Sequence, residues 1–309
     1  MDIKNVVILG SGPAGLTAGI YAARSDLKPI LVSGSTPGGQ LTITSLVENY
    51  PGFENGILGP ELMLKMQKQA ENTGVIFEDG TVVKVDFSNR PFTIFTEDKQ
   101  FKTRTVIIST GASVKWLGLD GETRLMGKGV SGCATCDGPF FKDKDIVVVG
   151  GGDSAMEESL FLTKFVKKIY LVHRRDEFRA SKIMQDRVLK DPKIEILFNS
   201  ELQDIYGENI VEGVKVLNNK TNSINDIKVQ GVFIAIGHTP NTEIFREFID
   251  TDNNGYIKVH EFTKTNVPGV FAAGDVSDPK YKQAISSAGL GCIAAMDAMH
   301  FIEGLNPKV

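Results

Sequence analysis

The sequence predicts an α/β protein of two domains, one inserted into the other. Two stretches each read as a strand, a glycine-rich turn, a helix and a second strand, and they lie about 140 residues apart. Two further apolar runs, residues 106–111 and 232–237, end in glycine and precede segments poor in apolar periodicity. Strands joined through helices form parallel sheets, so each stretch predicts one Rossmann-like domain, and the two glycine-ended runs mark the crossings between domains.

The first unit starts with the apolar run 5–9 and continues through a glycine turn into a helix at 17–24 and a strand at 29–33. The turn reads GSGPAG and consists of Gly10, Ser11, Gly12, Pro13, Ala14 and Gly15. In this pattern the first glycine makes the tight turn, the second lets the backbone approach a pyrophosphate, and the third lets the helix pack on the strand. The second strand ends in Ser33-Gly34 without an acid, so the motif alone leaves open whether it binds FAD or a nicotinamide nucleotide.

The second unit has a strand at 146–149, the turn GGGDSA at 150–155, a helix at 156–165 and a strand at 169–172. Ala155 takes the third glycine position, which the pattern permits. The last strand is followed by His173, Arg174 and Arg175, with Arg179 four residues after Arg175. Because guanidinium groups suit a phosphate better than a neutral hydroxyl, this unit is predicted to prefer NADPH to NADH.

A third strand pattern near the C-terminus, VFAAGD at 270–275, ends in Gly274 and Asp275. An aspartate at the mouth of a parallel strand can accept hydrogen bonds from a sugar-alcohol chain, such as the one that a flavin carries. The position therefore favours FAD in the first domain.

Composition restricts the class of protein. The chain has 309 residues, 41% of them hydrophobic and 23% charged, with a formal net charge of −4. These values are typical of a soluble globular protein and give no electrostatic reason to expect nucleic acid or an anionic membrane as a partner. We see no signal-peptide pattern at the start and no run approaching roughly 18 apolar residues. Three cysteines are too few for a disulfide scaffold, so we expect a cytoplasmic protein in which a C-x-x-C pair is metal-binding or catalytic.

Seven motifs, in order along the chain, resemble those of bacterial low-molecular-weight thioredoxin reductase, a pyridine nucleotide-disulfide oxidoreductase of class II. They are GSGPAG at 10–15, GGQL at 38–41, VENYPGF at 47–53, CATCDG at 133–138, GGGDSAMEE at 150–158, HRRDEFRA at 173–180 and VFAAGDV at 270–276. The resemblance implies two Rossmann-like FAD/NAD(P)-binding domains with the NADPH domain inserted in the FAD domain. It assigns residues 1–114 and 243–309 to the FAD domain and 115–242 to the NADPH domain.

The resemblance also implies which residues bind the two cofactors. Those implied for FAD are Gly10, Ser11, Gly12, Pro13, Ala14, Gly15, Gly39, Gln40, Leu41, Asn49, Val83, Gly111, Gly274, Asp275, Lys282, Gln283 and Ala284. Those implied for NADPH are Gly151, Gly152, Asp153, Ser154, His173, Arg174, Arg175, Arg179, Ile236 and Gly237. Lys282 stands where the family often has arginine, which keeps the charge but changes the contact.

The pair Cys133 and Cys136 is best interpreted as a redox couple. The third cysteine, Cys292, lies far away in a helical stretch of small residues, and no histidine is near the pair, so the ligands for a zinc site are missing. A structural disulfide is disfavoured in the cytoplasm, whereas two cysteines at a helix start can form a readily reduced bridge. The resemblance implies that Cys136 faces the flavin, that Cys133 attacks the disulfide of oxidised thioredoxin, and that Asp137 is the general acid.

Since CATC belongs to the NADPH domain and must meet the same flavin as the nicotinamide, the family's mechanism implies a rotation about the crossings near 112–116 and 241–245. The family also implies a homodimer. Three alternatives agree less well with the sequence. A flavoprotein that oxidises a small dithiol with oxygen has no use for the arginines, a ferredoxin–NADP reductase lacks the cysteine pair, and a flavin redox sensor needs a further domain.

One motif points elsewhere. Residues 250–255 and Glu261 match the EF-hand calcium loop. The segment 262–269 that follows is β-branched and broken by proline, and residues 255–259 alternate like a strand, so we predict no bound metal there.

Overall fold

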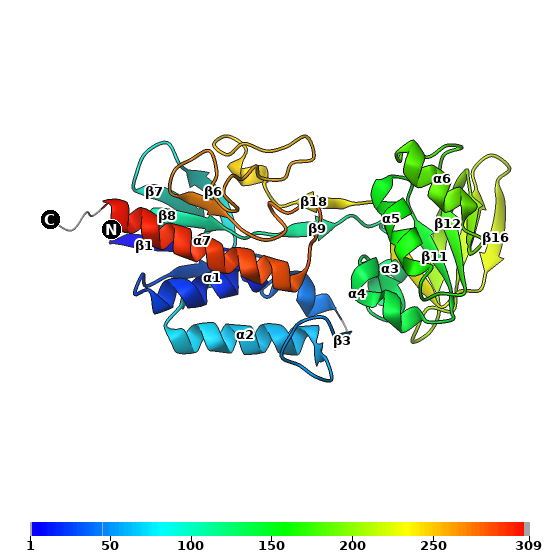
Figure 1. Ribbon diagram of the computed structural model, residues 1–309, viewed down its shortest axis with the longest axis horizontal. Helices are drawn as coiled ribbons and strands as arrows, with labels where there is room; N and C mark the ends of the chain where they lie inside the picture. Colours follow the sequence, from blue (N-terminus) through cyan, green and yellow to red (C-terminus); the bar gives the residue numbers. More distant parts are fainter. Residues whose placement is uncertain (1, 45, 306–309) are drawn as a thin grey trace. The chain divides into compact units, whose positions relative to one another are not determined.

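The computed structural model describes residues 2–44 and 46–305 and separates into two compact units (Figure 1). Unit 1 is Met1–Ser113 with Thr239–Val309, and unit 2 is Val114–His238. The junctions expected from the sequence fall one and four residues after these boundaries. Both boundaries lie in short strands, β9 (Ala112–Val114) and β18 (His238–Pro240), which pair with each other as a two-stranded sheet.

Unit 1 is built on a seven-stranded sheet in the order β5-β2-β1-β8-β7-β6, with β19 pairing with β8. Its strands are β1 (Ile3–Leu9), β2 (Ile30–Val32), β5 (Ile76–Glu78), β6 (Val82–Asp86), β7 (Phe92–Thr96), β8 (Gln100–Ile108) and β19 (Val270–Ala272). The strands β5, β2, β1, β8 and β19 are parallel, whereas β6 and β7 extend the sheet as an antiparallel hairpin. Strand β1, the helix that follows the first glycine turn and the parallel strand β2 form the β-α-β unit expected for that turn.

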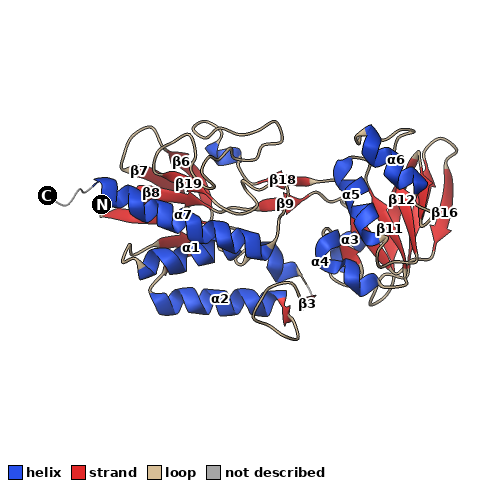
Figure 2. Cartoon of the chain, in the orientation of Figure 1, coloured by secondary structure: helices blue, strands red, loops and turns tan. Residues whose placement is uncertain are grey.

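Helices α1 (Pro13–Arg24), α2 (Gly59–Thr73) and α7 (Ala284–Leu305) lie together on one side of this sheet (Figure 2). On β1, Val6 and Ile8 join the hydrophobic cluster under these helices, whereas Val7 and Leu9 join the cluster on the other face. Both faces of β1 are therefore buried. This explains why the strand is a continuous apolar run rather than an alternating one.

From the sequence we expected no segment long and apolar enough to cross a membrane, and helix α7 does not agree with this expectation. Of the described residues, α7 alone passes that test by length and composition, with a mean hydropathy of 1.4 over its most apolar window. All of its buried residues except Ile302 are small, and Gly291 lies directly against the backbone of Ala14 on α1. Packing on α1 thus accounts for the apolar character of the helix.

Unit 2 holds a five-stranded parallel sheet in the order β10-β17-β11-β12-β13 and a three-stranded antiparallel sheet. The parallel strands are β10 (Val130–Ser131), β11 (Asp145–Val149), β12 (Lys168–Val172), β13 (Ile194–Leu197) and β17 (Gly231–Ile234). The antiparallel strands are β14 (Ser200–Tyr206), β15 (Gly213–Asn218) and β16 (Ser223–Ile227). The helices are α3 (Asp120–Arg124), α4 (Ala134–Asp137), α5 (Asp153–Leu162) and α6 (Lys182–Lys190).

The remaining short elements are η1 (Gly39–Ile43), β3 (Leu46–Val47), β4 (Ile57–Leu58), η2 (Gly138–Phe141) and η3 (Glu243–Phe245). Two expectations about local structure were wrong. Helices α1 and α5 begin directly at the glycine turns, four and three residues before the predicted starts, because the helical backbone begins inside the turn and the apolar periodicity only after it. Residues 255–259 form no strand and contribute only an isolated bridge between Thr251 and Ile257.

Candidate redox centre and dinucleotide sites

The glycines of the first turn serve two different needs. A Cβ on Gly10 would lie 2.4 Å from the carbonyl oxygen of Ser109, and one on Gly15 would lie 1.9 Å from that of Gly10, so packing within the protein excludes any side chain at both. Gly12 is different, because its φ of −70° suits any residue and a Cβ there would meet nothing within 4 Å. Packing within the protein therefore does not require glycine at position 12. The open space in front of Gly12 would let the pyrophosphate of a ligand approach the backbone closely.

Ser11 ties this turn to two neighbouring segments. Its hydroxyl donates to the carbonyl of Ser33 at 2.8 Å and accepts the N–H of Gly38 at 3.0 Å. Gly39, Gln40 and Leu41 follow in η1, and the Gln40 side chain donates to the carbonyl of Ala112 at 3.2 Å, next to Gly111. These predicted FAD residues therefore gather at the carboxyl ends of β1, β2 and β8.

The predicted C-terminal FAD residues lie at the same edge of the sheet. A Cβ on Gly274 would be 2.9 Å from that of Ala14, which places the end of β19 beside the first turn. The carboxylate of Asp275 accepts a hydrogen bond from Ser287 at 2.9 Å, and burial raises the pKa of Asp275 although this bond opposes it. Asn49 and Gln283 are 234 residues apart in sequence, yet the side-chain amide of Asn49 donates to the side-chain oxygen Oε1 of Gln283 at 3.2 Å.

Three more predicted FAD residues have distinct surroundings. Lys282 donates to the carbonyl of Pro279 at 2.7 Å, and Ala284 is the first residue of α7. Val83 lies on β6, three strands from β1 in the sheet, with 47% of its side chain exposed. The structure thus brings most of the set together at one edge and leaves Val83 apart from the glycine turn.

The second glycine turn repeats this division of roles. A Cβ on Gly150 would lie 2.5 Å from the carbonyl oxygen of Ala235, just before Ile236 and Gly237, and one on Gly151 would lie 2.2 Å from the ring of His173. Gly152 has an ordinary φ of −99° and open space in front of it, as Gly12 does. The same fit to an approaching pyrophosphate therefore exists at the start of α5, where Ser154 occupies the first turn.

The basic segment after β12 is divided between surface and interior. Arg174, Arg175 and Arg179 are exposed, and the backbone N–H of Arg179 donates to the carbonyl of Gly151 at 2.8 Å. His173, in contrast, is 6% exposed, and its Nε2 bonds the carbonyl of Glu177 at 3.0 Å. Burial lowers the pKa of His173, and the three arginines lower it further against the effect of the Glu177 carbonyl.

Asp153 links this segment to the turn. Its carboxylate accepts hydrogen bonds from the N–H and the hydroxyl of Ser181, at 2.9 and 2.8 Å, and these bonds hold the pKa of Asp153 below its ordinary value. The backbone of the arginine segment is thus held at a defined place relative to the start of α5. That arrangement suits a phosphorylated ribose.

Cys133 and Cys136 form a disulfide, with their Cα atoms 5.3 Å apart. Cys133 precedes the short helix α4, and Cys136 lies inside it. Both residues are partly exposed, and the hydroxyl of Thr135 lies 3.4 Å from the sulfur of Cys133. Among the described residues no group of three or more His, Cys, Asp and Glu side chains could hold a metal ion. The bonded pair is therefore available for thiol–disulfide exchange.

Asp137 follows the pair directly and is set in apolar surroundings. Its Oδ1 is buried without a hydrogen-bond partner in the described part of the chain, and burial raises the pKa of Asp137. The Ser131 hydroxyl acts in the opposite direction. A carboxyl group with a raised pKa remains protonated closer to neutral pH, which is the property that a general acid needs.

Comparison with known proteins agrees with this geometry. The family model for pyridine nucleotide-disulphide oxidoreductases matches residues 4–291. The chain belongs to this family, and within it to the thioredoxin reductases. The thioredoxin reductase of Rickettsia typhi is 53% identical over 96% of this chain and 97% of its own length, and that of Streptomyces coelicolor is 50% identical over 99% and 96%.

Solved thioredoxin reductases have a similar fold. The crystal structure of the enzyme from Streptococcus pyogenes is 42% identical and aligns with a TM-score of 0.94 over 98% of this chain and 99% of that one. The enzyme from Giardia duodenalis is 41% identical, with a TM-score of 0.92 over 96% and 98%. As a thioredoxin reductase of this family, the protein is an oxidoreductase that uses FAD and NADPH.

The sequence interpretation missed two residues that shape these sites. Ser131 accepts the backbone N–H of Cys133 at 3.0 Å, and its hydroxyl lowers the pKa of Asp137. Glu122 is 2% exposed and accepts backbone N–H groups of Leu117, Gly118 and Leu119 at 2.7 to 3.0 Å, which fixes the segment after Trp116. The serine stands two residues before the C-x-x-C pair, but nothing in that spacing indicates a function.

Proposed function

We propose that this chain is a thioredoxin reductase that transfers electrons from NADPH, through FAD and the Cys133–Cys136 disulfide, to oxidised thioredoxin. The observation that carries the proposal is the disulfide across two residues, placed beside a partly buried carboxyl group with a raised pKa. Relatives that bear the name thioredoxin reductase over nearly the whole chain support the choice of partner.

Unit 1 would hold FAD and unit 2 would hold NADPH. In unit 1 the open space at Gly12, the segment around Gln40 and the carboxylate of Asp275 fit a flavin dinucleotide. In unit 2 the open space at Gly152 fits a pyrophosphate, and the exposed arginines fit the 2′-phosphate that distinguishes NADPH from NADH. Bound FAD would accept two electrons as hydride from NADPH and deliver them to the disulfide.

The chain's own residues would then perform thiol–disulfide exchange. Once the bridge is reduced, the Cys133 thiolate attacks one sulfur of the thioredoxin disulfide, and a mixed disulfide forms as the other thioredoxin sulfur leaves. Asp137 would give its proton to the leaving thiolate. Cys136 would then attack the sulfur of Cys133, which releases reduced thioredoxin and restores the Cys133–Cys136 bond. Two electrons pass to the partner in each cycle.

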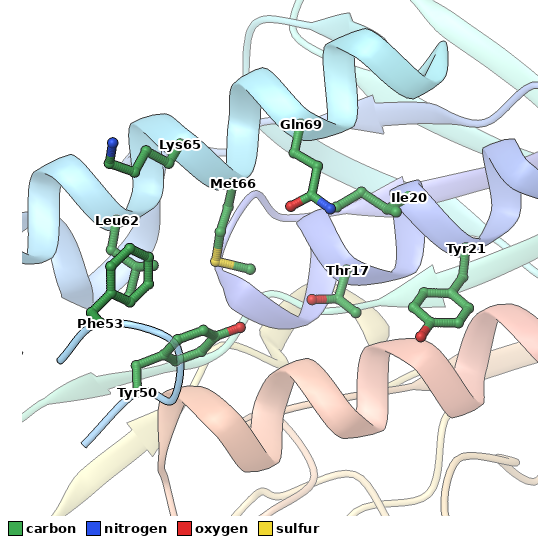
Figure 3. Close-up of a pocket in the computed structure, with 9 residues that line it drawn as sticks. All are labelled: Thr17, Ile20, Tyr21, Tyr50, Phe53, Leu62, Lys65, Met66 and Gln69. Carbon is green, nitrogen blue, oxygen red and sulfur yellow. The ribbon is translucent and has the colours of Figure 1, made fainter. Parts of the chain in front are cut away.

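A homodimer in the cytoplasm is part of this proposal. On the α1–α2 side of unit 1 three large apolar side chains are exposed, Tyr21 by 43%, Leu58 by 54% and Leu64 by 66%. Of these, Tyr21 lines a cavity of about 250 Å³ in which Tyr50 and Phe53 face helix α2 (Figure 3). We propose that a second copy of the chain covers this surface, since monomers rarely leave such clusters open to water. Sedimentation of the holoenzyme and of a Leu64→Glu variant would test it, and two monomeric proteins would refute it.

The central experiment uses the holoenzyme under anaerobic conditions. NADPH should bleach the yellow flavin, and oxidised thioredoxin should restore it, whereas oxygen or ferredoxin in place of thioredoxin should not do so at a comparable rate. A variant in which both cysteines are serine should still be bleached by NADPH but should not reduce thioredoxin. If that variant reduced thioredoxin at the wild-type rate, the proposed route would be wrong.

A further inference from the structure

The turn between β15 and β16, residues 219–222, is bonded to the arginine segment that follows β12, residues 173–179. The side-chain amide nitrogen of Asn219 donates a hydrogen bond to the carbonyl of Arg174 at 2.8 Å. The same nitrogen also donates to the Glu201 carboxylate on β14 at 3.2 Å. An amide nitrogen has two protons, so both are used, and the side chain of Asn219 is held in one orientation.

A second route of hydrogen bonds joins the same turn to the next arginine. The backbone N–H of Asn219 donates to the carbonyl of Asn199 at 2.7 Å, and the N–H of Asn199 donates to the carbonyl of Arg175 at 2.9 Å. Asn199 has a φ of +51°, a left-handed conformation that asparagine adopts more readily than most residues. The carbonyls of Arg174 and Arg175 are therefore both tied to Asn219, one by its side chain and one through its backbone.

Lys220, the next residue of the turn, brings a positive charge to the arginine segment. Its Nζ lies 3.2 Å from the carboxylate of Asp176, which directly follows Arg175. The two side chains are 60% and 68% exposed, so this ion pair contributes little to stability. Its effect is electrostatic, because the cation offsets a carboxylate that stands among the arginines and would repel a phosphate.

A phosphate group is recognised by cations that stand at suitable positions, as well as by the amount of positive charge. Arg174, Arg175 and Arg179 are exposed, and their long side chains lose conformational freedom when they bind an anion. A backbone that is already fixed before binding lowers this cost. The bonds from Asn219 supply such a fixed backbone for the first two arginines.

We propose that the β15–β16 turn forms part of the subsite for the 2′-phosphate of NADPH. Asn219 is a positioning residue that holds the backbone of Arg174. Lys220 is a specificity-determining residue that offsets the charge of Asp176 beside the phosphate. The inference rests on the proposed function, because it adds these residues to the nucleotide site of unit 2.

The test measures the binding of NADP⁺ and of NAD⁺ to the oxidised holoenzyme by isothermal titration calorimetry. The two nucleotides differ only in the 2′-phosphate, so the ratio of their Kd values isolates the recognition of that group. Asn219→Ala removes the side-chain bond to Arg174 and keeps the backbone bond to Asn199, and Lys220→Gln removes the charge. Thermal unfolding shows that each variant is folded.

Two further variants of the same three-stranded sheet serve as matched controls. Lys215→Gln also removes one lysine and one exposed ion pair, that of Lys215 with Asp204 at 3.6 Å. Asn209→Ala removes an exposed asparagine side chain from the loop at the opposite end of β15. Both variants should bind NADP⁺ and NAD⁺ as the wild type does.

In Lys220→Gln we expect the Kd for NADP⁺ to rise about fivefold, the upper value for an exposed charge pair, and the Kd for NAD⁺ to stay unchanged. The rise should shrink between about 0.1 M and 1 M salt, because salt screens exposed charges. Adding Asp176→Asn to Lys220→Gln should restore the affinity for NADP⁺, since no carboxylate is left to offset. In Asn219→Ala the Kd for NADP⁺ alone should rise about twofold to tenfold, the factor that corresponds to one neutral hydrogen bond.

Wild-type affinity for NADP⁺ in either Asn219→Ala or Lys220→Gln would overturn the proposal. So would an equal loss of affinity for NADP⁺ and NAD⁺, or a loss in Lys215→Gln as large as that in Lys220→Gln. Failure of the proposed function gives a different result, because the wild-type holoenzyme itself would then bind NADP⁺ no more tightly than NAD⁺.

Discussion

Two glycines of α7 allow the packing of unit 1 to be tested with a matched pair of variants. Gly291 is buried, and a Cβ there would lie 2.1 Å from the carbonyl oxygen of Ala14. Gly289 is exposed on the same helix, and a Cβ there would meet nothing within 4 Å. Alanine at either position gains the same helix propensity, about 0.5–1 kcal/mol, so this gain cancels when the two variants are compared.

The difference between Gly291→Ala and Gly289→Ala therefore measures the clash alone. Ordinary contact begins at 3.4 Å, so α7 and the start of α1 would have to separate by about 1.3 Å, which is 3.4 minus 2.1. Overpacking of this kind costs about 1–3 kcal/mol. For a unit of this size, that is a difference in Tm on the order of 2–12 °C.

The movement of α1 should also loosen the flavin, because Ala14 lies in the turn that we propose for FAD. Thermal unfolding followed by circular dichroism gives the Tm, and the rise in flavin fluorescence on heating reports the release of FAD. We expect Gly291→Ala to lose FAD at a lower temperature than the wild type and Gly289→Ala to retain it. Equal Tm and FAD release in the two variants would show that the packing of α7 on α1 does not position the turn.

Four further outcomes are expected. Asp137→Asn should lower kcat for thioredoxin reduction at least about 100-fold, within the range attributed to general acids. Burial raises the pKa of Asp137, so the folded protein loses stability as the pH rises above the ordinary pKa of an aspartate and the carboxyl ionises. The Asp137→Asn variant should therefore have a higher Tm than the wild type at neutral pH, and the two Tm values should converge in acid. Gly152→Ala should leave the Tm unchanged but raise KM for NADPH, whereas Gly151→Ala should also lower the Tm because its Cβ meets His173. Arg175→Ala should raise KM for NADPH about tenfold and leave KM for NADH unchanged, as steady-state kinetics with both nucleotides would show.

Much of the candidate site was readable from short sequence patterns. The glycine turns after β1 and β11, the arginines after β12 and the C-x-x-C pair each act within a few residues, and their spacing has a direct physical meaning. The starts of α1 and α5 were placed too late because apolar periodicity begins only after the turn, whereas the helical backbone begins inside it.

The tertiary structure decided which residues meet across long separations. Asn49 and Gln283, or Gly291 and Ala14, are neighbours only because β19 and α7 return to the edge where the chain began. No local pattern distinguishes Gly12, which leaves open space for a ligand, from Gly15, which the protein's own backbone fills. The sequence by itself determined the chemistry, since glycine turns, arginines and paired cysteines carry it locally. Packing determined which groups surround that chemistry, because burial and hydrogen bonding depend on segments far apart in the chain.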